Sequence, residues 1–253
     1  MPAPKNHFKE ALAAGQPQIG LWLGLADPYV AGLCAGAGFD WLVVDGEHGP
    51  NDLRSTLAAL TAIGDRSQAV VRPPIGEIWL IKQLLDIGAQ SLLIPMIESV
   101  EEARRMVAAV RYPPKGRRGV GAFGRAADFG RVRDYVTTAD AEICLLLQVE
   151  SRAGLAALPG ILELDGVDGV FIGPADLAAD MGYPGQSGQP EVLSAIEAAI
   201  TRIVSSGKAA GILTFDRALA ARYLALGATF VAVGTDVGTL VGGLAALRGS
   251  VRP

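Results

Sequence analysis

Two acidic residues follow apolar segments that are about one βαβ repeat apart, and they are the strongest candidates for chemistry in this chain. Glu150 ends the apolar run 143–149, and Asp176 follows Gly173-Pro174-Ala175 after the next run. In neighbouring strands of a parallel barrel, the two carboxylates would lie side by side at the carboxyl ends, where such barrels bind ligands. With Gln148 and water, they would suit a hard divalent ion. The pair therefore predicts a metal site.

Asp176 also has a structural interpretation that does not exclude the first. It suits the N-cap of a helix that starts at Leu177, where backbone N–H groups favour a nearby anion. Two further acids, Glu98 and Asp216, end other apolar runs. We expect these ends to shape the pocket, and Asp216 is equally suited to cap a helix.

A second cluster places Asp45, Glu47 and His48 within four positions at the end of another apolar run. The chain has two histidines, and His7 lies in a predicted N-terminal helix. His48 is therefore the imidazole available for general acid/base chemistry near neutral pH. A lone histidine is more often structural, but its position beside two acids favours a functional role.

Arg72 ends the following strand-like run, and Pro73 and Pro74 fix the backbone after it. A guanidinium at this rim can hold a carboxylate or stabilise an enolate oxygen as negative charge develops. An ion pair with Glu47 or Asp45 is the structural alternative, and it is compatible with function.

A Schiff-base mechanism needs a lysine inside the barrel near the carboxyl end of a strand. The lysines do not meet this requirement, because two are N-terminal, one lies on a predicted helix, one lies in a long loop and one precedes the seventh predicted strand: Lys5, Lys9, Lys82, Lys115 and Lys208. Carbon–carbon chemistry at a 2-keto acid would then rely on a metal as the electron sink.

The elements that position these residues alternate between short apolar runs and helical patterns. Ser99 with Glu102, for example, forms a capping box before one helix. Eight repeats in 253 residues favour a single-domain (β/α)8 TIM barrel over a doubly wound sheet, and no G-x-G-x-x-G opens the first βα turn. We predict strands at 18–25, 40–46, 67–73, 91–97, 142–150, 167–173, 208–215 and 229–236.

Two segments leave alternatives open. The Gly/Arg-rich connection 112–125 is long for a compact domain, so its arginines either meet anionic substrate groups or solvate a surface loop. The apolar run 239–247 is either the closing helix of the barrel or a contact for another subunit.

Composition excludes several classes of function. The net charge of -4, without a basic stripe, argues against nucleic-acid binding. Cys34 and Cys144 lie in separate apolar segments without a C-x-x-C pair, which indicates reduced core cysteines. The N-terminus lacks the apolar region of a signal peptide, and no run reaches the roughly 18 apolar residues of a membrane span. We therefore expect a cytoplasmic enzyme that acts on small molecules and does not bind membranes.

The combination of these motifs, in this order, resembles the HpcH/HpaI aldolase family, and most closely its 4-hydroxy-2-oxoheptanedioate aldolases. The resemblance implies a (β/α)8 barrel, a class II pyruvate aldolase that uses Mg²⁺, Mn²⁺ or Co²⁺, and a homohexamer of dimers that exchange C-terminal helices. It runs from about residue 18 to 240 and rests on Asp45-Gly46-Glu47-His48-Gly49-Pro50-Asn51, Val71-Arg72-Pro73, the segment 81–90, Gln148-Val149-Glu150-Ser151 and Gly173-Pro174-Ala175-Asp176-Leu177.

The same resemblance assigns roles to individual residues. It makes Glu150 and Asp176 the metal ligands, and it makes Gln148 a neighbour that positions substrate or water. His48 becomes the acid/base, and Arg72 becomes the residue that stabilises the enolate.

Other positions of the motifs would contact the substrate or assist the histidine. The backbone N–H groups of Ala175 and Asp176, in the turn that begins Gly173-Pro174, would hold the pyruvate carboxylate, and Leu213 would lie near the aldehyde. Asp86 matches a position that pairs with the histidine. Our helix prediction puts Asp86 near the opposite rim, so it would reach His48 only across a subunit boundary or from a differently placed helix.

The resemblance implies reversible retro-aldol cleavage of a 4-hydroxy-2-keto acid, such as 4-hydroxy-2-oxoheptanedioate, to pyruvate or a close 2-keto acid and an aldehyde such as succinic semialdehyde. Residues 122–125 depart from the Ser-Ala-Leu-Ala-Arg-like stretch of relatives, which leaves the natural aldehyde open. The alternatives are a citrate-lyase-like enzyme that cleaves a CoA thioester and a non-catalytic barrel that binds keto acids.

Overall fold

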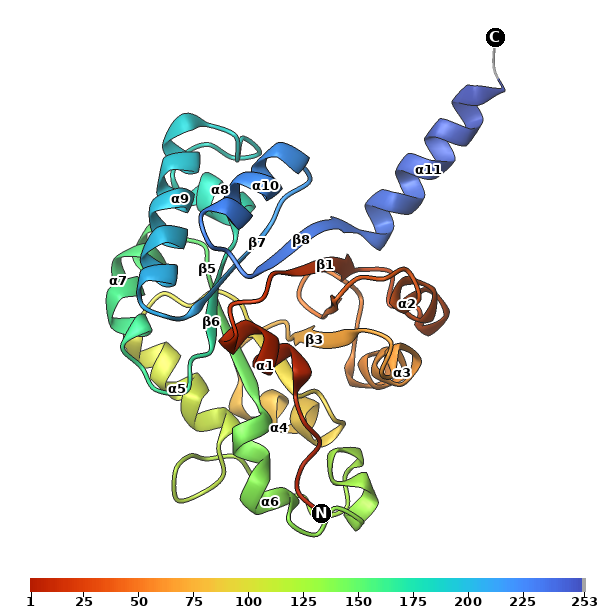
Figure 1. Cartoon of the computed structure of the whole chain (residues 1–253), viewed down its shortest axis with the longest axis vertical. Coiled ribbons are helices and arrows are strands. Elements are labelled where there is room, and N and C mark those ends of the chain that lie inside the picture. The colour runs from red at the N-terminus through yellow and green to blue at the C-terminus, as the bar shows by residue number, and fades with distance from the viewer. Residues whose placement is uncertain (252–253) are drawn as a thin grey trace.

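The computed structural model describes residues 1–251 and has eight parallel strands that close into one barrel, with helices around it (Figure 1). Each strand pairs with the next along the chain, and β8 pairs with β1. The strands are β1 Gln18–Leu23, β2 Trp41–Asp45, β3 Gln68–Arg72, β4 Ser91–Ile94, β5 Cys144–Val149, β6 Gly169–Ile172, β7 Ala209–Leu213 and β8 Phe230–Thr235. The predicted (β/α)8 barrel is confirmed, and each of the eight predicted strands overlaps an observed strand, although the predicted fourth strand, 91–97, runs past the observed end at Ile94.

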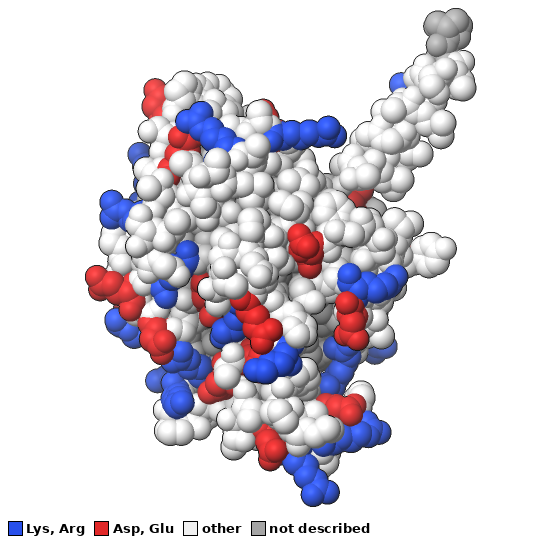
Figure 2. Space-filling model, in the orientation of Figure 1, with Lys and Arg blue, Asp and Glu red and all other residues white. Residues whose placement is uncertain are grey.

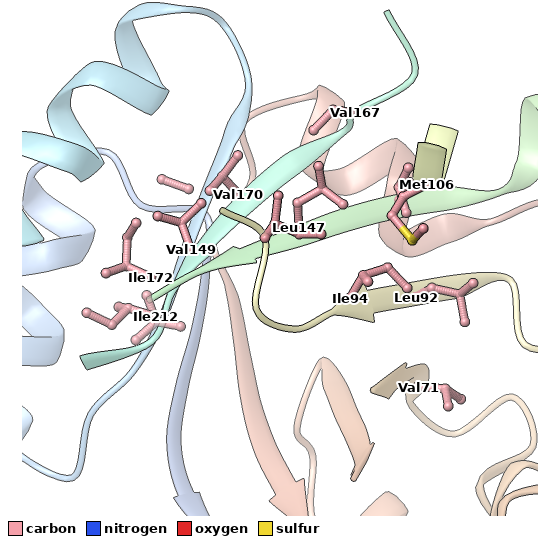
Figure 3. Packing of buried hydrophobic residues seen from close by; sticks show 14 of the residues in the cluster. Val71, Leu92, Ile94, Met106, Leu147, Val149, Val167, Val170, Ile172 and Ile212 are labelled. Atoms are coloured by element: carbon pink, nitrogen blue, oxygen red, sulfur yellow. The ribbon is translucent and has the colours of Figure 1, made fainter. Parts of the chain in front are cut away.

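Alternate residues of the strands pack on the two faces of the sheet, as the period of two requires. Outward-facing aliphatic side chains fill the layer between the sheet and the helices, and Figure 3 shows members of this layer on successive strands, among them Val71, Leu92 and Leu147. Inward-facing rings fill the interior, where the centroids of Trp22 and Phe171 lie 5.4 Å apart. Such a filled interior confines ligands to the ends of the barrel.

The helices begin and end where short capping signals stand in the sequence. Ser99 and Glu102 form the predicted capping box at α5, and Asp216 is the N-cap of α10. The helices are α1 His7–Ala13, α2 Pro28–Ala35, α3 Leu53–Ile63, α4 Ile78–Asp86, α5 Val100–Val110, α6 Tyr135–Thr138, α7 Arg152–Leu162, α8 Pro174–Asp180, α9 Pro190–Ser205, α10 Arg217–Ala225 and α11 Asp236–Ser250, with 3-10 turns at Arg125–Gly130 and Ala139–Glu142.

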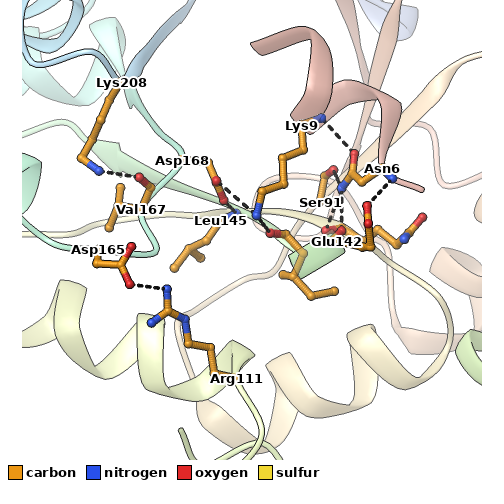
Figure 4. A network of polar contacts seen from close by, with 12 residues as sticks. Asn6, Lys9, Ser91, Arg111, Glu142, Leu145, Asp165, Val167, Asp168 and Lys208 are labelled. Atoms are coloured by element: carbon orange, nitrogen blue, oxygen red, sulfur yellow. Dashed lines mark hydrogen bonds and ion pairs between the residues drawn. The ribbon is translucent and has the colours of Figure 1, made fainter. Parts of the chain in front are cut away.

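The amino-terminal end of the barrel is closed by α1. Phe8 on this helix is fully buried against the rings of Trp41 and Phe230 in the interior. A polar network surrounds the helix, in which Asn6 and Lys9 reach segments more than 80 residues away (Figure 4). Helix α1 and its polar contacts therefore close this end of the barrel, and we call this region the floor.

The last helix, α11, extends away from the barrel, as Figure 1 shows. Asp236 at its start is buried and accepts hydrogen bonds from the N–H groups of Gly24 and Leu25. Apolar side chains farther along are more than half exposed, and few charges lie on the helix (Figure 2). They include Leu240, Val241, Leu244 and Leu247. The predicted closing helix is therefore wrong, because this helix packs on the barrel only at its base; the alternative, a contact with another subunit, stays a prediction.

In the long connection between α5 and β5, Arg117 is exposed, as the surface-loop alternative predicted, whereas two other arginines follow neither alternative. Arg118 is fully buried, and Arg125 donates a hydrogen bond to the carbonyl of Ile87. Cys34 and Cys144 are buried free thiols, as predicted. Within residues 1–251, no helix combines the length and the apolar character needed to cross a membrane.

Candidate active site

A cavity of about 250 Å³ opens at the carboxyl ends of the strands. It brings together residues that stand far apart in the sequence, as expected when parallel strands end at one rim. Polar side chains from strands 2, 3, 5 and 6 line one part, and apolar side chains from strand 7, α9 and α10 line the rest. The lining includes Trp22, His48, Arg72, Gln148, Glu150, Phe171, Gly173, Pro174, Ala175, Asp176, Leu193, Ile196, Leu213, Phe215 and Tyr223.

Glu150, directly after β5, is 3% exposed, so its carboxylate lies in a site from which water is largely excluded. One oxygen accepts the N–H of Met96 at 2.9 Å, and the other accepts Nε2 of Gln148 at 2.5 Å. Burial raises the pKa of Glu150 above its ordinary value, the two hydrogen bonds oppose the rise, and the charge of Asp176 adds to it. Oε1 of Gln148 is buried without a hydrogen-bond partner in the described chain. This part of the cavity is therefore rich in oxygen and short of positive charge.

Asp176 lies in the first turn of α8, and the prediction that it caps a helix starting at Leu177 is wrong. The helix begins at Pro174, and Gly173 is its N-cap, without a side-chain hydrogen bond. The N–H groups of Ala175 and Asp176 thus begin a helix whose first turn has no side-chain cap, and such groups suit an anionic ligand. A Cβ at Gly173 would lie 2.3 Å from Oε2 of Glu150, so glycine is required for this close approach.

Arg72 is buried between two carboxylates, and the predicted ion pair with Glu47 or Asp45 is confirmed, because Arg72 pairs with both. Its Nε and Nη2 donate to the two oxygens of Asp45 at 2.8 and 2.7 Å, and Nη1 lies 2.7 Å from Oε2 of Glu47. The guanidinium also lies over the ring of Trp22, 5.2 Å from its centroid. These contacts on several sides fix the guanidinium in the wall of the cavity.

The two carboxyls beside Arg72 differ in pKa. For Asp45, burial acts to raise the pKa, but the hydrogen bonds and charge of Arg72 and two backbone N–H groups lower it overall. For Glu47, burial raises the pKa, and the charge of Arg72 offsets this only in part. The difference follows from geometry, because Asp45 makes the bidentate contact and Glu47 does not.

His48 lines the cavity but forms no tight pair within the chain. Its side chain is 65% exposed, and Nε2 lies 3.9 Å from Oε2 of Glu47. Its backbone N–H reaches Asp45 Oδ1 at 3.4 Å. The imidazole is therefore available to a ligand in the cavity.

Asp86 is the one predicted catalytic residue that this chain does not bring to the cavity. It ends α4, as expected, and the chain then enters the amino end of β4. Its carboxylate lies 3.5 Å from Arg118 and is not part of the cavity lining. Any contact between Asp86 and His48 would have to involve a second copy of the chain.

The residues present fit a divalent ion held by few protein ligands. The described chain contains no group of three or more His, Cys, Asp and Glu arranged for a metal. Two carboxylates, Glu150 and Asp176, beside the unpartnered amide oxygen of Gln148 match the mode in which Mg²⁺ keeps water and takes substrate oxygens. None of the five lysines lines the cavity, as predicted.

Several cavity residues were not predicted from the sequence. Trp22 and Phe171 belong to strands whose inward positions follow from alternation, so this signal was available. Met96 does not line the cavity, but its positive φ of 56°, unusual for a residue with a side chain, points its backbone N–H at Glu150. Tyr223 on α10 enters from a helix, and no local pattern indicates that. Leu213 lines the cavity, as expected.

Comparisons with known proteins agree with this geometry. The sequence profile of the family described as HpcH/HpaI aldolase/citrate lyase matches residues 18–242. A protein of Deinococcus radiodurans named hydroxypyruvate/pyruvate aldolase is 62% identical over 233 residues, which cover 91% of this chain and 84% of that protein.

Two further relatives extend the comparison. A Salmonella dublin protein named 4-hydroxy-2-oxo-heptane-1,7-dioate aldolase is 57% identical over 245 residues, which cover 96% of this chain and 93% of that protein. The crystal structure of an HpcH/HpaI aldolase/citrate lyase family protein from Burkholderia cenocepacia superposes with a TM-score of 0.95 at 39% identity, covering 98% of this chain and 100% of that one.

Proposed function

The chain belongs to the HpcH/HpaI aldolase/citrate lyase family, and we propose that it is a metal-dependent class II aldolase that cleaves 4-hydroxy-2-keto acids reversibly to pyruvate, or a close 2-keto acid, and an aldehyde. One observation carries the proposal. A single cavity places the carboxylates of Glu150 and Asp176, the uncapped N–H groups of α8 and the fixed guanidinium of Arg72 around one space. This set matches the charge pattern of a 2-keto acid and its enolate.

The acidic side of the cavity would hold a divalent ion. Glu150 and Asp176 would bind it, with Gln148 beside them, and the ion would supply Lewis-acid stabilisation of negative charge on the 2-keto oxygen. The N–H groups of Ala175 and Asp176 would hold the substrate carboxylate. The charge of Asp176 adds to the raised pKa of the buried Glu150, and a cation held by the two carboxylates would offset this repulsion.

Arg72 would stabilise the enolate from the opposite side. Asp45 and Glu47 fix its guanidinium before substrate arrives, so little reorganisation accompanies the reaction. Asp45 and Glu47 neutralise much of the charge of Arg72. The cavity would therefore bind the neutral keto group without a large excess of positive charge.

His48 would handle the protons. In the cleavage direction it takes the proton of the 4-hydroxyl, directly or through water; the C3–C4 bond then breaks, the electron pair moves to form the C2–C3 enolate, and C4 becomes the aldehyde carbonyl. The protonated imidazole then returns a proton to C3, which gives the methyl group of pyruvate. Its exposure and lack of a tight partner leave it free for both transfers.

The aldehyde part of the substrate would lie toward Leu213 and Phe215. One relative is named for hydroxypyruvate and pyruvate and the other for the aldol 4-hydroxy-2-oxo-heptane-1,7-dioate, and each of these compounds contains a 2-keto acid part. Cleavage of 4-hydroxy-2-oxo-heptane-1,7-dioate would release succinic semialdehyde together with pyruvate, so we propose succinic semialdehyde as one acceptor aldehyde. We expect the enzyme to accept other aldehydes as well.

We propose a homohexamer of dimers that exchange α11. The exposed apolar side chains along this helix support the proposal, since patches of this kind mark contacts with another protein surface. Asp86 would then reach His48 of a neighbouring subunit. Analytical ultracentrifugation of the full chain and of a chain ending after Thr235 tests this. The same number of subunits in both assemblies would contradict the exchange.

The decisive experiment follows pyruvate release from a panel of 4-hydroxy-2-keto acids with a coupled dehydrogenase. A chelator should abolish turnover, and Mg²⁺, Mn²⁺ or Co²⁺ should restore it. Turnover that survives chelation and is trapped by borohydride would overturn the mechanism. Cleavage of CoA thioesters instead would favour the citrate-lyase-like alternative, and binding of keto acids without turnover would favour the non-catalytic barrel.

A further inference from the structure

Arg118 has an unusual environment for an arginine in a glycine-rich connection. It is 0% exposed, although Arg117 beside it is exposed. Its guanidinium carbon lies 4.5 Å from the ring centroid of Tyr112 and 5.6 Å from that of Tyr135. Nη2 also lies 3.2 Å from the hydroxyl of Tyr135. The cation is therefore enclosed by two aromatic faces.

A buried guanidinium is costly unless its charge and its donors are satisfied. Among residues 1–251, the carboxylate within ion-pair distance of Arg118 is that of Asp86, 3.5 Å away. Nε and Nη1 have no hydrogen-bond partner. The aromatic faces offset part of the cost. The field of this cation consequently acts mainly on Asp86.

The cation of Arg118 favours the ionised form of Asp86 in a setting that disfavours it. It is the last residue of α4, and the carboxyl end of a helix disfavours a negative charge. Burial raises the pKa of Asp86, and the charge of Arg118, its hydrogen bond and then the charge of Lys82 oppose the rise. Lys82 lies on the same helix, whereas Arg118 comes from the loop packed against it.

The other titratable groups around this pair have partners of their own or are tyrosines packed on the guanidinium. Burial raises the pKa of Tyr112 to about 12, and the Tyr135 hydroxyl lies 3.2 Å from Nη2 of Arg118. Asp140 accepts the N–H of Tyr112, and Arg125 donates to the carbonyl of Ile87. Arg118 is thus the cation that faces Asp86 from the packed loop.

The loop packs closely around Asp86, whose side chain is 28% exposed. Oδ1 faces Arg118, while a Cβ built on Gly121 would lie 3.2 Å from Oδ2. A Cβ on Gly124 would lie 2.8 Å from the carbonyl oxygen of Asp86, so the loop approaches the helix end closely. Phe123 and Val120, between and beside these glycines, are exposed. The carboxylate is therefore paired with Arg118 on one oxygen and remains partly exposed.

We propose that Arg118 is a positioning residue that keeps Asp86 ionised and oriented for the acid/base step in a neighbouring subunit. This inference rests on the proposed function for the role of Asp86. The link between Arg118 and Asp86 rests on the geometry of this chain alone.

The test compares Arg118→Met, Arg118→Lys, Asp86→Asn and the double variant Arg118→Met with Asp86→Asn. Arg118→Met should move the acidic limb of kcat/KM to higher pH and lower kcat/KM by about tenfold near pH 6, as loss of one charged hydrogen bond implies. Arg118→Lys should restore much of the profile. In the Asp86→Asn background, Arg118→Met should have no further effect, because the group it serves is gone. Arg117→Met, the same charge change on the exposed neighbour, should leave the profile unchanged.

Thermal unfolding tests the link without using activity. Without Arg118, the pKa of Asp86 in the folded state should exceed its unfolded value by a larger margin. A carboxyl with a raised folded-state pKa contributes stability to the fold at low pH, and this contribution is lost as pH rises through the folded pKa. As pH rises above the ordinary pKa of an aspartate, the Tm of Arg118→Met should therefore fall relative to that of the double variant. The Tm of the wild type should fall less relative to that of Asp86→Asn.

The outcomes separate the positioning role of Arg118 from the proposed aldolase function. Effects of the two substitutions that simply add, or a pH profile that does not move while Tm falls, would overturn the positioning role. A wild-type enzyme without aldolase turnover would overturn the proposed function and the acid/base role of Asp86, while the Tm comparison would still decide whether Arg118 sets the ionisation of Asp86.

Discussion

The amino-terminal floor of the barrel and its carboxyl-terminal cavity each bury charged and amide side chains, but they satisfy them differently. At the floor, Asn6 donates Nδ2 to Gln90 O, Ser91 Oγ and Glu142 O, and Lys9 donates to Ile143 O (Figure 4). In the cavity, Gln148 keeps a buried oxygen without a partner in the described chain.

The charges at the two ends follow the same division. Lys9 lies 3.3 Å from Asp168 at the floor, and the amine of Lys208 donates to two carbonyls. In the cavity, Glu150 receives hydrogen bonds from neutral groups, and its pKa is raised. Polar groups that the fold satisfies itself stabilise the structure, whereas groups it leaves unsatisfied await a ligand. Four predictions test this contrast, from the largest effect to the smallest.

Glu150→Gln should have the largest effect, because it removes a proposed metal ligand while keeping the shape of the side chain. We expect kcat/KM to fall by about 10³-fold or more, the scale of losing a metal's stabilisation of several kcal/mol. Tm should stay the same or rise, because a buried negative charge has been removed. Steady-state kinetics and calorimetry check both values. A fall in Tm without a large kinetic loss would place Glu150 with the structural groups.

His48→Ala should slow proton exchange at the methyl group of pyruvate by about 100-fold, a typical contribution of general acid/base catalysis. Loss of the methyl signal in deuterated water, followed by NMR, measures this rate. Mn²⁺ affinity, measured by titration calorimetry, should change little. His7→Ala is the matched control, since His7 is an exposed histidine at the floor. Equal loss of exchange and metal affinity in His48→Ala would contradict the assignment.

Asn6→Ala should affect the floor without affecting chemistry. It removes the N-cap of α1 and three Nδ2 hydrogen bonds, so the free energy of unfolding should fall by about 1–3 kcal/mol. Urea titration measures this change. Asn6→Asp keeps the capping oxygen but not the donor, so its free energy of unfolding should lie between those of the wild type and Asn6→Ala. We expect unchanged kcat/KM in both variants, and a kinetic defect at full folding would refute the separation of the two ends.

The smallest effect concerns pH and Asp45. The folded-state pKa of Asp45 is lower than its ordinary value, so its ionised form stabilises the fold. That contribution is fully present above the unfolded pKa and is lost as pH falls through the folded pKa. Free energies of unfolding measured below pH 5 should therefore decline less steeply in Asp45→Asn than in the wild type. Parallel curves would show that Arg72 does not depend on Asp45 for its pairing.

The sequence predicted the barrel and most of the cavity because these depend on local patterns. Apolar runs set the eight strands, and Glu150, Arg72, His48 and Asp176 each follow such a run, so one rim collects them. The predicted end of the fourth strand was too long, because the chain turns at Pro95 and Met96 to aim an N–H at Glu150.

What the sequence did not predict depends on packing between distant segments. Arg118 looks like a loop cation, and its burial follows only from Tyr112 and Tyr135 closing around it. The direction of α11 depends on Asp236, which binds the backbone after β1, more than 200 residues away. No periodicity contains such information.

The floor formed by α1 has a consequence for the order in which this protein is completed during synthesis. Asn6 and Lys9 leave the ribosome well before their polar partners, which lie at Gln90, Ser91, Glu142, Ile143 and Asp168. Phe8 likewise completes its ring contacts only after Phe230 is made. Helix α1 therefore docks long after its own synthesis, and a nascent chain that stops before Asp168 lacks part of the closure at this end of the barrel.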